Sequence, residues 1–176
     1  MIQDHSGLIW AGGENGVMVF HPDSLLVDDS QYSWLHFEKN NPESLNNNIV
    51  KTILEDSEHR VWIGTSGGGL NLATQNPSTG GFKLKHYTSE EGLINNMIQA
   101  MLEENKQNIW ISTESGISKF NPTDMVFENY SFLDVWESDL FCQASAYKRK
   151  NGDLMFGSYN GMYIFNPSSF DARNFT

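Results

Sequence analysis

The sequence predicts an all-β protein built from one repeated unit of about four short strands. Runs of four to nine residues, rich in β-branched and aromatic side chains, alternate with Gly, Asn and Ser turns along the chain. No segment keeps the 3.6-residue apolar period of an amphipathic helix. One motif also recurs every 45 to 52 residues, in the strings LIWAGGENGVMVF, RVWIGTSGGGLNL, NIWISTESGISKF and DLMFGSYNGMYIF.

Three positions of the motif have structural roles that can be read from the repeat. A large apolar residue comes first, at Trp10, Trp62, Trp110 and Met155. A small residue follows two positions later, where it leaves room for a neighbouring sheet, at Gly12, Gly64, Ser112 and Gly157. A glycine follows six positions after the large residue, in a turn that we expect to require positive φ, at Gly16, Gly68, Gly116 and Gly161.

Each unit reads as four strands in order. In the second unit we expect strands over 48–56, 61–65, 70–73 and 82–87, and in the third over 97–104, 109–113, 117–120 and 126–130. The first two strands of a unit are apolar on both faces, whereas the fourth is more polar. Repeated four-stranded units with dry inner strands and wet outer strands predict a β-propeller.

We therefore expect one propeller segment over 1–176 with four blades, at about 1–44, 45–92, 93–135 and 136–176. The segment is incomplete at both ends, because the first unit begins at its second strand and the last stops after its third. Terminal faces of repeat arrays need covering. We expect them to pack on the remaining blades or on another copy of the chain, as a homo-oligomer.

Composition excludes several classes of partner. The chain has 22 acidic and 11 basic residues and a formal net charge of −11, so nucleic acid is excluded as a partner. The single cysteine, Cys142, excludes an intrachain disulfide. No run approaches the roughly 18 apolar residues of a spanning helix, and the N-terminus lacks the features of a signal peptide. No membrane contact is expected for this segment.

Several strings resemble the two-component regulator propeller repeat, among them SLNNNIVKTILEDSEHRVWIGTSGGGLNL and GLINNMIQAMLEENKQNIWISTESGISKFNP. In that family an inner strand ends in Glu-Asp and is followed by Leu-Trp-Ile-Gly-Thr and a Gly-Leu strand. The resemblance covers essentially the whole chain. Glu104 departs from the pattern by standing in place of the Asp, and the last unit holds two extra residues between Trp136 and Met155.

The resemblance implies the periplasmic sensor region of a hybrid two-component system histidine kinase of Bacteroidetes, a receptor that detects oligosaccharides. This chain would be the C-terminal part of the second propeller, with any kinase activity outside it. We therefore expect a non-enzymatic module for ligand recognition in signal transduction, with no cofactor. An enzymatic propeller of the glycosidase or lyase type and a purely structural oligomerisation module remain alternatives.

Candidate catalytic and metal-binding residues are few. Paired carboxylates can hydrolyse glycosides, but those of this chain recur with the repeat, which favours strand-end roles, at Glu55, Asp56, Glu103 and Glu104. Two histidines precede an aromatic residue on outer strands of different blades, at His36 and His86. Two others fall in turns where the sequence shows no common partner, at His5 and His59. No metal site is expected.

Residues that break the repeat are the better candidates for binding a sugar, which needs an aromatic face beside amides and carboxylates. Trp136 and Asp139 lie in a loop that leads into an inner strand, at a place where the other units have leucine. Tyr159 and Asn160 lie in the turn between the second and third strands of the last unit. We expect these two classes of loop at opposite ends of a blade, with packing as the competing role of Trp136.

Overall fold

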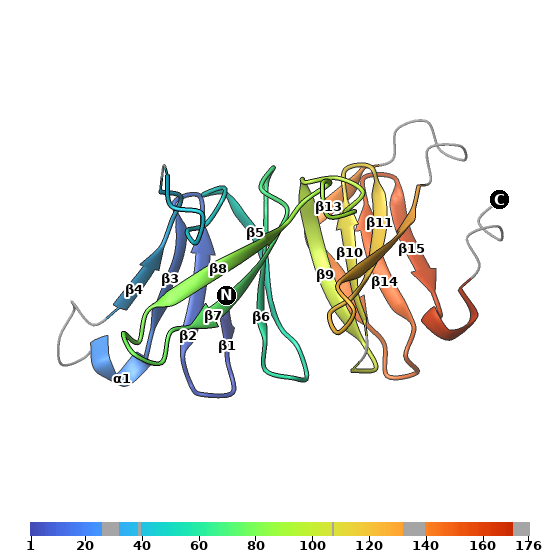
Figure 1. The fold of residues 1–176 in the computed structure, drawn as a ribbon. Helices are drawn as coiled ribbons and strands as arrows, with labels where there is room; N and C mark the ends of the chain where they lie inside the picture. Colours follow the sequence, from blue (N-terminus) through green and yellow to red (C-terminus); the bar gives the residue numbers. More distant parts are fainter. Residues whose placement is uncertain (26–31, 39, 107, 132–139, 171–176) are drawn as a thin grey trace.

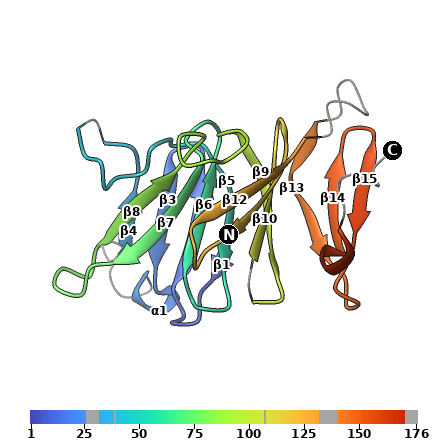
Figure 2. The ribbon, with the colours of Figure 1, turned by 45° about the vertical axis from the view of Figure 1, so that its right-hand side comes forward.

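The computed structural model describes residues 1–25, 32–38, 40–106, 108–131 and 140–170. The chain forms four antiparallel sheets. β4 lies at the left and β15 at the right of Figure 1, and β15 lies at the right of Figure 2 as well. Within each sheet the strands follow chain order. The predicted all-β class and propeller arrangement are confirmed. No helix in these ranges is long and apolar enough to cross a membrane.

The strands have the following bounds. Blade 1 contains β1 (Ile2–Gln3), β2 (Ile9–Gly13), β3 (Gly16–Phe20) and β4 (Tyr32–Leu35). Blade 2 contains β5 (Val50–Glu55), β6 (Val61–Thr65), β7 (Leu70–Gln75) and β8 (Phe82–Tyr87). Blade 3 contains β9 (Ile98–Glu104), β10 (Asn108–Thr113), β11 (Gly116–Asn121) and β12 (Val126–Tyr130). Blade 4 contains β13 (Phe141–Lys148), β14 (Leu154–Ser158) and β15 (Gly161–Phe165).

Two short helical pieces complete the described chain. These are α1 (Pro22–Leu25), between β3 and β4, and the 3₁₀ turn η1 (Pro167–Ser169), after β15. Each begins at a proline, whose fixed φ suits the first helical position and whose missing N–H has no helical partner there. Neither piece interrupts a sheet, so both serve as connections.

The first blade starts differently from the prediction. Its first strand is present as the two-residue β1, in which Ile2 pairs with Trp10 and Gln3 with Ile9. The unit therefore does not begin at its second strand. A strand of two residues without alternation gives too weak a pattern to be read from sequence.

The repeated tryptophans lie between neighbouring blades, as the repeat predicts. Trp10 of blade 1 shares a core with Val61 and Leu84 of blade 2, and Trp62 shares the next core with Ile111 and Phe120 of blade 3. The third core contains Trp110. All three indoles are almost fully buried. Each therefore fills the wedge between one blade and the next.

The small residue of the motif gives the next blade its space. A Cβ on Gly64 would lie 2.6 Å from Ile98 Cγ2 of blade 3 and 2.8 Å from Thr52 Cγ2, which is closer than carbon atoms approach. Gly12 faces Val50 and Ile53 of blade 2 in the same way. Glycine at this position therefore lets the inner strand of the following blade approach.

One glycine prediction is wrong. Gly16, Gly116 and Gly161 have positive φ, but Gly68 does not, and Gly67 and Gly69 have it instead. The β6–β7 turn is one residue longer, since Trp62 pairs with Leu72, ten residues on, where Trp10 pairs with Val19, nine residues on. The longer turn moves the required glycine to Gly69, whose missing Cβ avoids the backbone carbonyl of Tyr87.

The expected placement of the loops is also wrong. Strands 2 and 4 of a blade run in the same direction, so the turn after strand 2 and the connection after strand 4 lie at one end, which we call the loop end (Figure 1). The amide of Gly16 donates to Asn48 O at 2.8 Å, and the amide of Tyr159 donates to Leu140 O at 3.1 Å. The turns between strands 1 and 2 form the opposite hairpin end.

The last blade absorbs its two extra residues in its inner strand. Phe141 pairs with Ser158 and Ala146 with Phe156, so four residues, 142–145, stand opposite Gly157 alone. In blade 2 a single residue is unpaired at this place, since Val50 pairs with Thr65 and Thr52 with Gly64. The insertion has enlarged an existing bulge without changing the register beyond it.

Candidate functional site

A groove at the loop end, between blades 1 and 2, has the composition of a ligand site. It has a volume of about 300 Å³. The connection from β4 to β5 supplies most of its wall, and β8 supplies one side chain, from Phe37, Glu38, Asn40, Asn41, Pro42, Ser44, Leu45, Asn46 and His86. Phe37 is 51% exposed, whereas Leu45 is fully buried. The groove thus combines an accessible aromatic ring with a carboxylate and several amides.

Hydrogen bonds hold the groove residues in place. The Asn41 side-chain amide donates to Glu38 Oε2 at 2.7 Å, and the Glu38 N–H donates to Ser44 Oγ at 3.0 Å. Asn46 donates to the carbonyl of Gly68, while its own Oδ1 is buried with no hydrogen-bond partner in the described chain. A buried amide oxygen without a donor is costly, and this one lies against Gly68, away from the solvent.

His86 has a structural role beneath this groove. Its Nε2 donates to the carbonyl of Ser44 at 2.7 Å. In blade 3 the equivalent Asn129 donates to the carbonyl of Gly92 at 2.8 Å. Both bonds fasten the residue that precedes a buried leucine, Leu45 or Leu93. The histidine predicted to be structural or solvated therefore ties the loop to the outer strand.

Three carboxylates that precede the second strands bind the indoles of the core. The Nε1–H groups of Trp10 and Trp62 donate to Asp4 Oδ2 at 2.7 Å and Asp56 Oδ2 at 2.8 Å. Trp110 donates to Glu104 Oε2 at 2.8 Å. Replacement of the usual Asp by Glu104 therefore keeps the indole hydrogen bond.

The two aspartates also organise the turn that follows them. Asp4 Oδ1 accepts from the backbone N–H groups two and four residues later, each at 3.0 Å. Asp56 Oδ1 makes the same two bonds at 3.0 Å. The longer Glu104 makes neither, and its turn instead has positive φ at Asn105 and Lys106. These carboxylates act in capping and packing, as the repeat predicts.

The other two repeated acids connect one blade to the next. Glu55 accepts the backbone N–H of His5 on both carboxylate oxygens at 3.0 Å. Glu103 accepts from Ser57 in the same way, from the backbone N–H at 2.9 Å and from the hydroxyl at 2.5 Å. Each glutamate at the end of an inner strand therefore holds the hairpin turn of the preceding blade.

His5 and His59 meet at the first of these joints, contrary to the expectation that they share no partner. The Nδ1 atoms of His5 and His59 lie 2.6 Å and 3.4 Å from Glu55 Oε1. Their rings stack with centroids 3.9 Å apart and 26° between planes. The sequence could not show this, because the two histidines belong to turns of different blades. His36 and His86 take no part in such a group within the described ranges.

Shifted pKa values mark three side chains. Burial opposes the ionisation of Asp4, but hydrogen bonds from Trp10 and Ser6 outweigh it and lower the pKa of Asp4. The backbone N–H of Thr88 donates to the Glu91 carboxylate and lowers its pKa. Burial, with a hydrogen bond to Glu128 and the charge of that group, raises the pKa of Tyr130 to about 12. All three shifts arise from turn or strand contacts.

The predicted ligand residues are only partly described by the structure. Trp136 and Asp139 lie outside the described residues, in segment 132–139. Tyr159 and Asn160 form the exposed β14–β15 turn at the loop end, and the Tyr159 side chain is 77% exposed. The Tyr159 amide contacts Leu140, the first described residue after that segment. Of the two candidate pairs, the structure therefore places only Tyr159 and Asn160.

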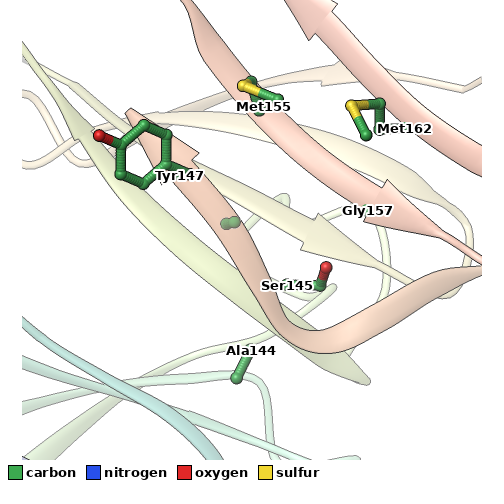
Figure 3. A pocket seen from close by; sticks show the side chains of 7 residues that line it. Ala144, Ser145, Tyr147, Met155, Gly157 and Met162 are labelled. Carbon is green, nitrogen blue, oxygen red and sulfur yellow. The ribbon is translucent and has the colours of Figure 1, made fainter. Parts of the chain in front are cut away.

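A second hollow lies on the outward face of blade 4. Figure 3 shows Tyr147, Met155 and Met162 around it, with Ser145 and Gly157 below, and its volume is about 300 Å³. Met155 holds the place of the inter-blade tryptophans, and Tyr147 beside it is 61% exposed. This is the face that carries Trp10, Trp62 and Trp110 against the next blade elsewhere. On blade 4 no described residue covers it.

Blade 1 exposes the complementary face. Ala11, Met18 and Trp34 lie in one cross-strand row, opposite in the sheet to Trp10. They line a hollow of about 240 Å³. At the internal joints this face of a blade receives the tryptophan of the preceding blade, as Ile63 does for Trp10. The two ends of the segment thus present the two halves of a blade joint.

Sequence reasoning missed the groove and the histidine joint. The groove is formed by a loop that shows in the sequence only an aromatic residue followed by a run of Asn, Pro and Ser between strands. The histidine joint had a clearer signal. His59 occupies the turn position three residues before the tryptophan, where blades 1 and 4 have Gly7 and Gly152. All three residues have positive φ, which a side chain other than glycine rarely adopts.

The comparisons with known proteins agree with this fold. The family model described as two component regulator propeller matches residues 44–67 and 92–115, which span the start of blades 2 and 3. No curated protein sequence matches the chain.

Several solved structures are similar over nearly the whole chain. One is the extracellular domain of a hybrid two component system from B. thetaiotaomicron, with 23% identity, a TM-score of 0.72 and coverage of 99% of this chain and 25% of that one. A second such domain from that organism has 28% identity, a TM-score of 0.49 and coverage of 94% and 27%.

PorZ, a surface component of the type-IX secretion system of Porphyromonas gingivalis, has 12% identity, a TM-score of 0.62 and coverage of 97% and 27%. The chain spans about a quarter of the length of the structures that it matches. The resemblance drawn from the sequence is thus confirmed, because residues 44–67 and 92–115 match the two component regulator propeller model and lie within a β-propeller segment.

Proposed function

We propose that this chain is a ligand-recognition segment of an extracytoplasmic, periplasmic sensor of the two-component type, and that its loop end binds oligosaccharides. The regulator repeats in blades 2 and 3 support the sensor role, as does the similarity in fold to an extracellular domain of a hybrid two component system. The histidine kinase activity of such a receptor would lie in another part of the protein. The observation that carries the ligand proposal is the groove around Phe37.

The groove has the chemistry that sugars require. The exposed ring of Phe37 offers an apolar face to the C–H side of a pyranose. Glu38 and Asn41 supply a charged acceptor and an amide that already hydrogen-bond to each other, so their geometry is set before the ligand arrives. These features favour a neutral polyhydroxylated ligand.

A non-catalytic role agrees with how the repeated acids are used. Glu55 and Glu103 hold hairpin turns, and Asp56 and Glu104 bind buried indoles. A glycosidase would need two carboxylates free to face one glycosidic bond. The repeated acids therefore support recognition over hydrolysis.

Trp136, Asp139, Tyr159 and Asn160 remain the second set of candidate ligand residues. Leu45 and Leu93, which hold the place of Trp136 in blades 2 and 3, are buried beneath their loops. A packing role for Trp136 therefore competes with sugar stacking. The variant Trp136→Ala separates the two roles. Loss of packing would lower the melting temperature of the protein, whereas loss of stacking would lower only its affinity for the sugar.

A calorimetric titration with a panel of plant and host oligosaccharides tests the proposal. We expect at least one to bind, and Phe37→Ala to weaken that binding by about tenfold, the value of about 1.4 kcal/mol of stacking. Tyr147→Ala, an exposed aromatic on the outward face of blade 4, is the matched control and should leave affinity unchanged. The ligand proposal fails if no oligosaccharide binds, or if neither Phe37→Ala nor Trp136→Ala changes the affinity of one that does.

We further propose that the segment assembles through its end faces, with a second copy as the partner. The face of blade 4 with Tyr147, Met155 and Met162 would receive the face of blade 1 with Ala11 and Trp34, as each internal joint pairs the same two faces. Such a head-to-tail contact is heterologous and forms rings or chains.

Sedimentation measures this assembly directly. We expect a concentration-dependent oligomer that the pair Tyr147→Lys and Met162→Lys dissociates, while Val126→Lys, at an exposed position on β12, leaves it intact. A monomer at all concentrations would refute assembly with a second copy through these faces.

A further inference from the structure

Two imidazoles and one carboxylate converge at the hairpin end, at the joint between blades 1 and 2. His5 comes from the β1–β2 turn, Glu55 from the end of β5, and His59 from the β5–β6 turn. One ligand atom from each lies within 4.8 Å of the other two. The cluster lies at the opposite end of the blades from the Phe37 groove, so it has a role of its own.

The spacing fits a single ion of small radius. Nitrogen and oxygen ligands at about 2.0 to 2.1 Å from Zn²⁺ in a tetrahedron stand about 3.3 Å from one another. Glu55 Oε1 and His59 Nδ1 are already 3.4 Å apart. His5 Nδ1 lies 2.6 Å from the same oxygen, so its ring must withdraw by under an ångström. The two rings are stacked 26° from parallel, so the His5 ring must also turn until its lone pair points at the same ion as that of His59. The His5 side chain has room for this rotation, because it is 51% exposed.

The carboxylate is the fixed member of the set. Glu55 has a side chain only 16% exposed, and both of its oxygens accept from the His5 backbone N–H. That bond is the kind of partner that orients a ligand from outside the coordination sphere. The two rings are accessible, which leaves an entry path and an open fourth position for water.

The fold does not need these imidazoles. The equivalent joint between blades 2 and 3 makes the same backbone contact with Ser57 in place of His5. At the place of His59, blades 1 and 4 have Gly7 and Gly152, and His59 shares their positive φ, at 62°, with a steric cost that glycine does not pay. The two histidines are therefore particular to this joint, since the equivalent positions hold Ser57 and Gln107 at the next joint along the chain.

We propose that His5, Glu55 and His59 bind one divalent transition-metal ion of the zinc class and so fasten blade 1 to blade 2. Two imidazoles with one carboxylate suit Zn²⁺, Ni²⁺ or Cu²⁺ better than Ca²⁺ or Mg²⁺, which prefer sets of oxygen ligands. The ion would replace a hydrogen-bonded contact with coordination that joins His5 to Glu55 and His59, which follow it by 50 and 54 positions in the chain. Blade 1 would thereby be held against its neighbour at the hairpin end.

Titration of the metal-free protein with ZnCl₂, followed by calorimetry, tests the site. We expect one strong site per chain, and loss of either imidazole to weaken binding by more than about 100-fold, since even outer partners of a ligand change affinity by 10- to 100-fold. His59→Gly is the preferred variant, because glycine suits the positive φ and should preserve the fold. His5→Gln removes the other ring. His36→Gln, at an exposed histidine on the loop end, is the matched control.

The melting temperature without metal shows whether each variant is folded. The proposal predicts that ZnCl₂ raises the melting temperature of the wild type and of His36→Gln but not of His59→Gly or His5→Gln. Co²⁺ in place of Zn²⁺ should give the visible absorption of tetrahedral coordination in the wild type and in His36→Gln. The same absorption should be missing from His59→Gly and His5→Gln. Absence of a strong site, or a site that His59→Gly leaves intact, overturns the proposal.

Discussion

Asp56 is the side chain whose removal should damage the fold most, because one carboxylate serves four donors. It is 3% exposed and accepts from the backbone N–H groups of Glu58 and Arg60 at 3.0 Å. It also accepts from Arg60 Nε at 2.7 Å and from Trp62 Nε1 at 2.8 Å. Asp56→Ala removes all four bonds and leaves the side-chain donors of Trp62 and Arg60 without an acceptor.

The magnitude follows from the groups left behind. The Trp62 N–H is buried, and an unsatisfied buried donor costs about 1 to 3 kcal/mol. Arg60 loses a charged hydrogen bond to a nearly buried carboxylate, which costs about 1.5 to 3 kcal/mol. Because the bonds share one acceptor the losses are not fully additive, and we expect a drop of about 3 to 5 kcal/mol in the free energy of unfolding.

Urea denaturation and thermal melting measure this loss. For a chain of this size a loss of about 3 to 5 kcal/mol lowers the melting temperature by roughly 6 to 20 °C. Asp4→Ala is the matched control, because Asp4 makes the same indole and turn contacts but is only half buried at the edge of blade 1, and should cost less. A change below about 0.5 kcal/mol for Asp56→Ala, or equal losses in the two variants, would refute the reasoning.

Three further outcomes follow from the same contacts. Gly64→Val should cost about 1 to 3 kcal/mol of unfolding free energy, because its side chain would collide with Ile98, whereas Gly13→Val, with open space around it, should cost little in the same urea titration. The lowered pKa of Asp4 contributes stability that is fully present above the ordinary pKa of about 3.9 and is lost as the pH falls through the lower folded value. Asp4→Asn should therefore flatten the acid limb of a curve of melting temperature against pH below about pH 4. An unchanged acid limb would count against this contribution. The phenolate absorbance that Tyr130→Phe removes should appear only near pH 12 in the folded wild type, and its appearance near pH 10 would show that burial and Glu128 do not act as described.

Much of the fold could be read from the sequence, since each blade repeats the same local pattern. The strands at 82–87 and 126–130 have the bounds that the pattern predicts. The tryptophans lie between blades as expected, because a wedge of one shape needs a side chain of similar size each time. Even the Glu104 departure keeps the indole hydrogen bond.

Two predictions, the turn glycine of blade 2 and the placement of the two classes of loop, are wrong for physical reasons. The motif spacing predicts positive φ at Gly68 and not at Gly69, because a run of three glycines does not show the length of its turn. Only the pairing of Trp62 with Leu72 fixes that length. The two loop classes share an end because alternate strands run in the same direction, a consequence of topology that the motif spacing does not display. That shared end places Tyr159 beside Leu140.

The sequence by itself determined what a blade is: four strands, a large side chain between blades, and a small residue that admits the neighbouring sheet. The tertiary structure alone decided what meets between blades, such as His5 with Glu55 and His59, or His86 with Ser44. The physical reason is that repetition encodes position within a unit, whereas contacts between units depend on the angle and stagger at which two sheets stack. Those quantities arise from the summed packing of whole faces and are carried by no single motif.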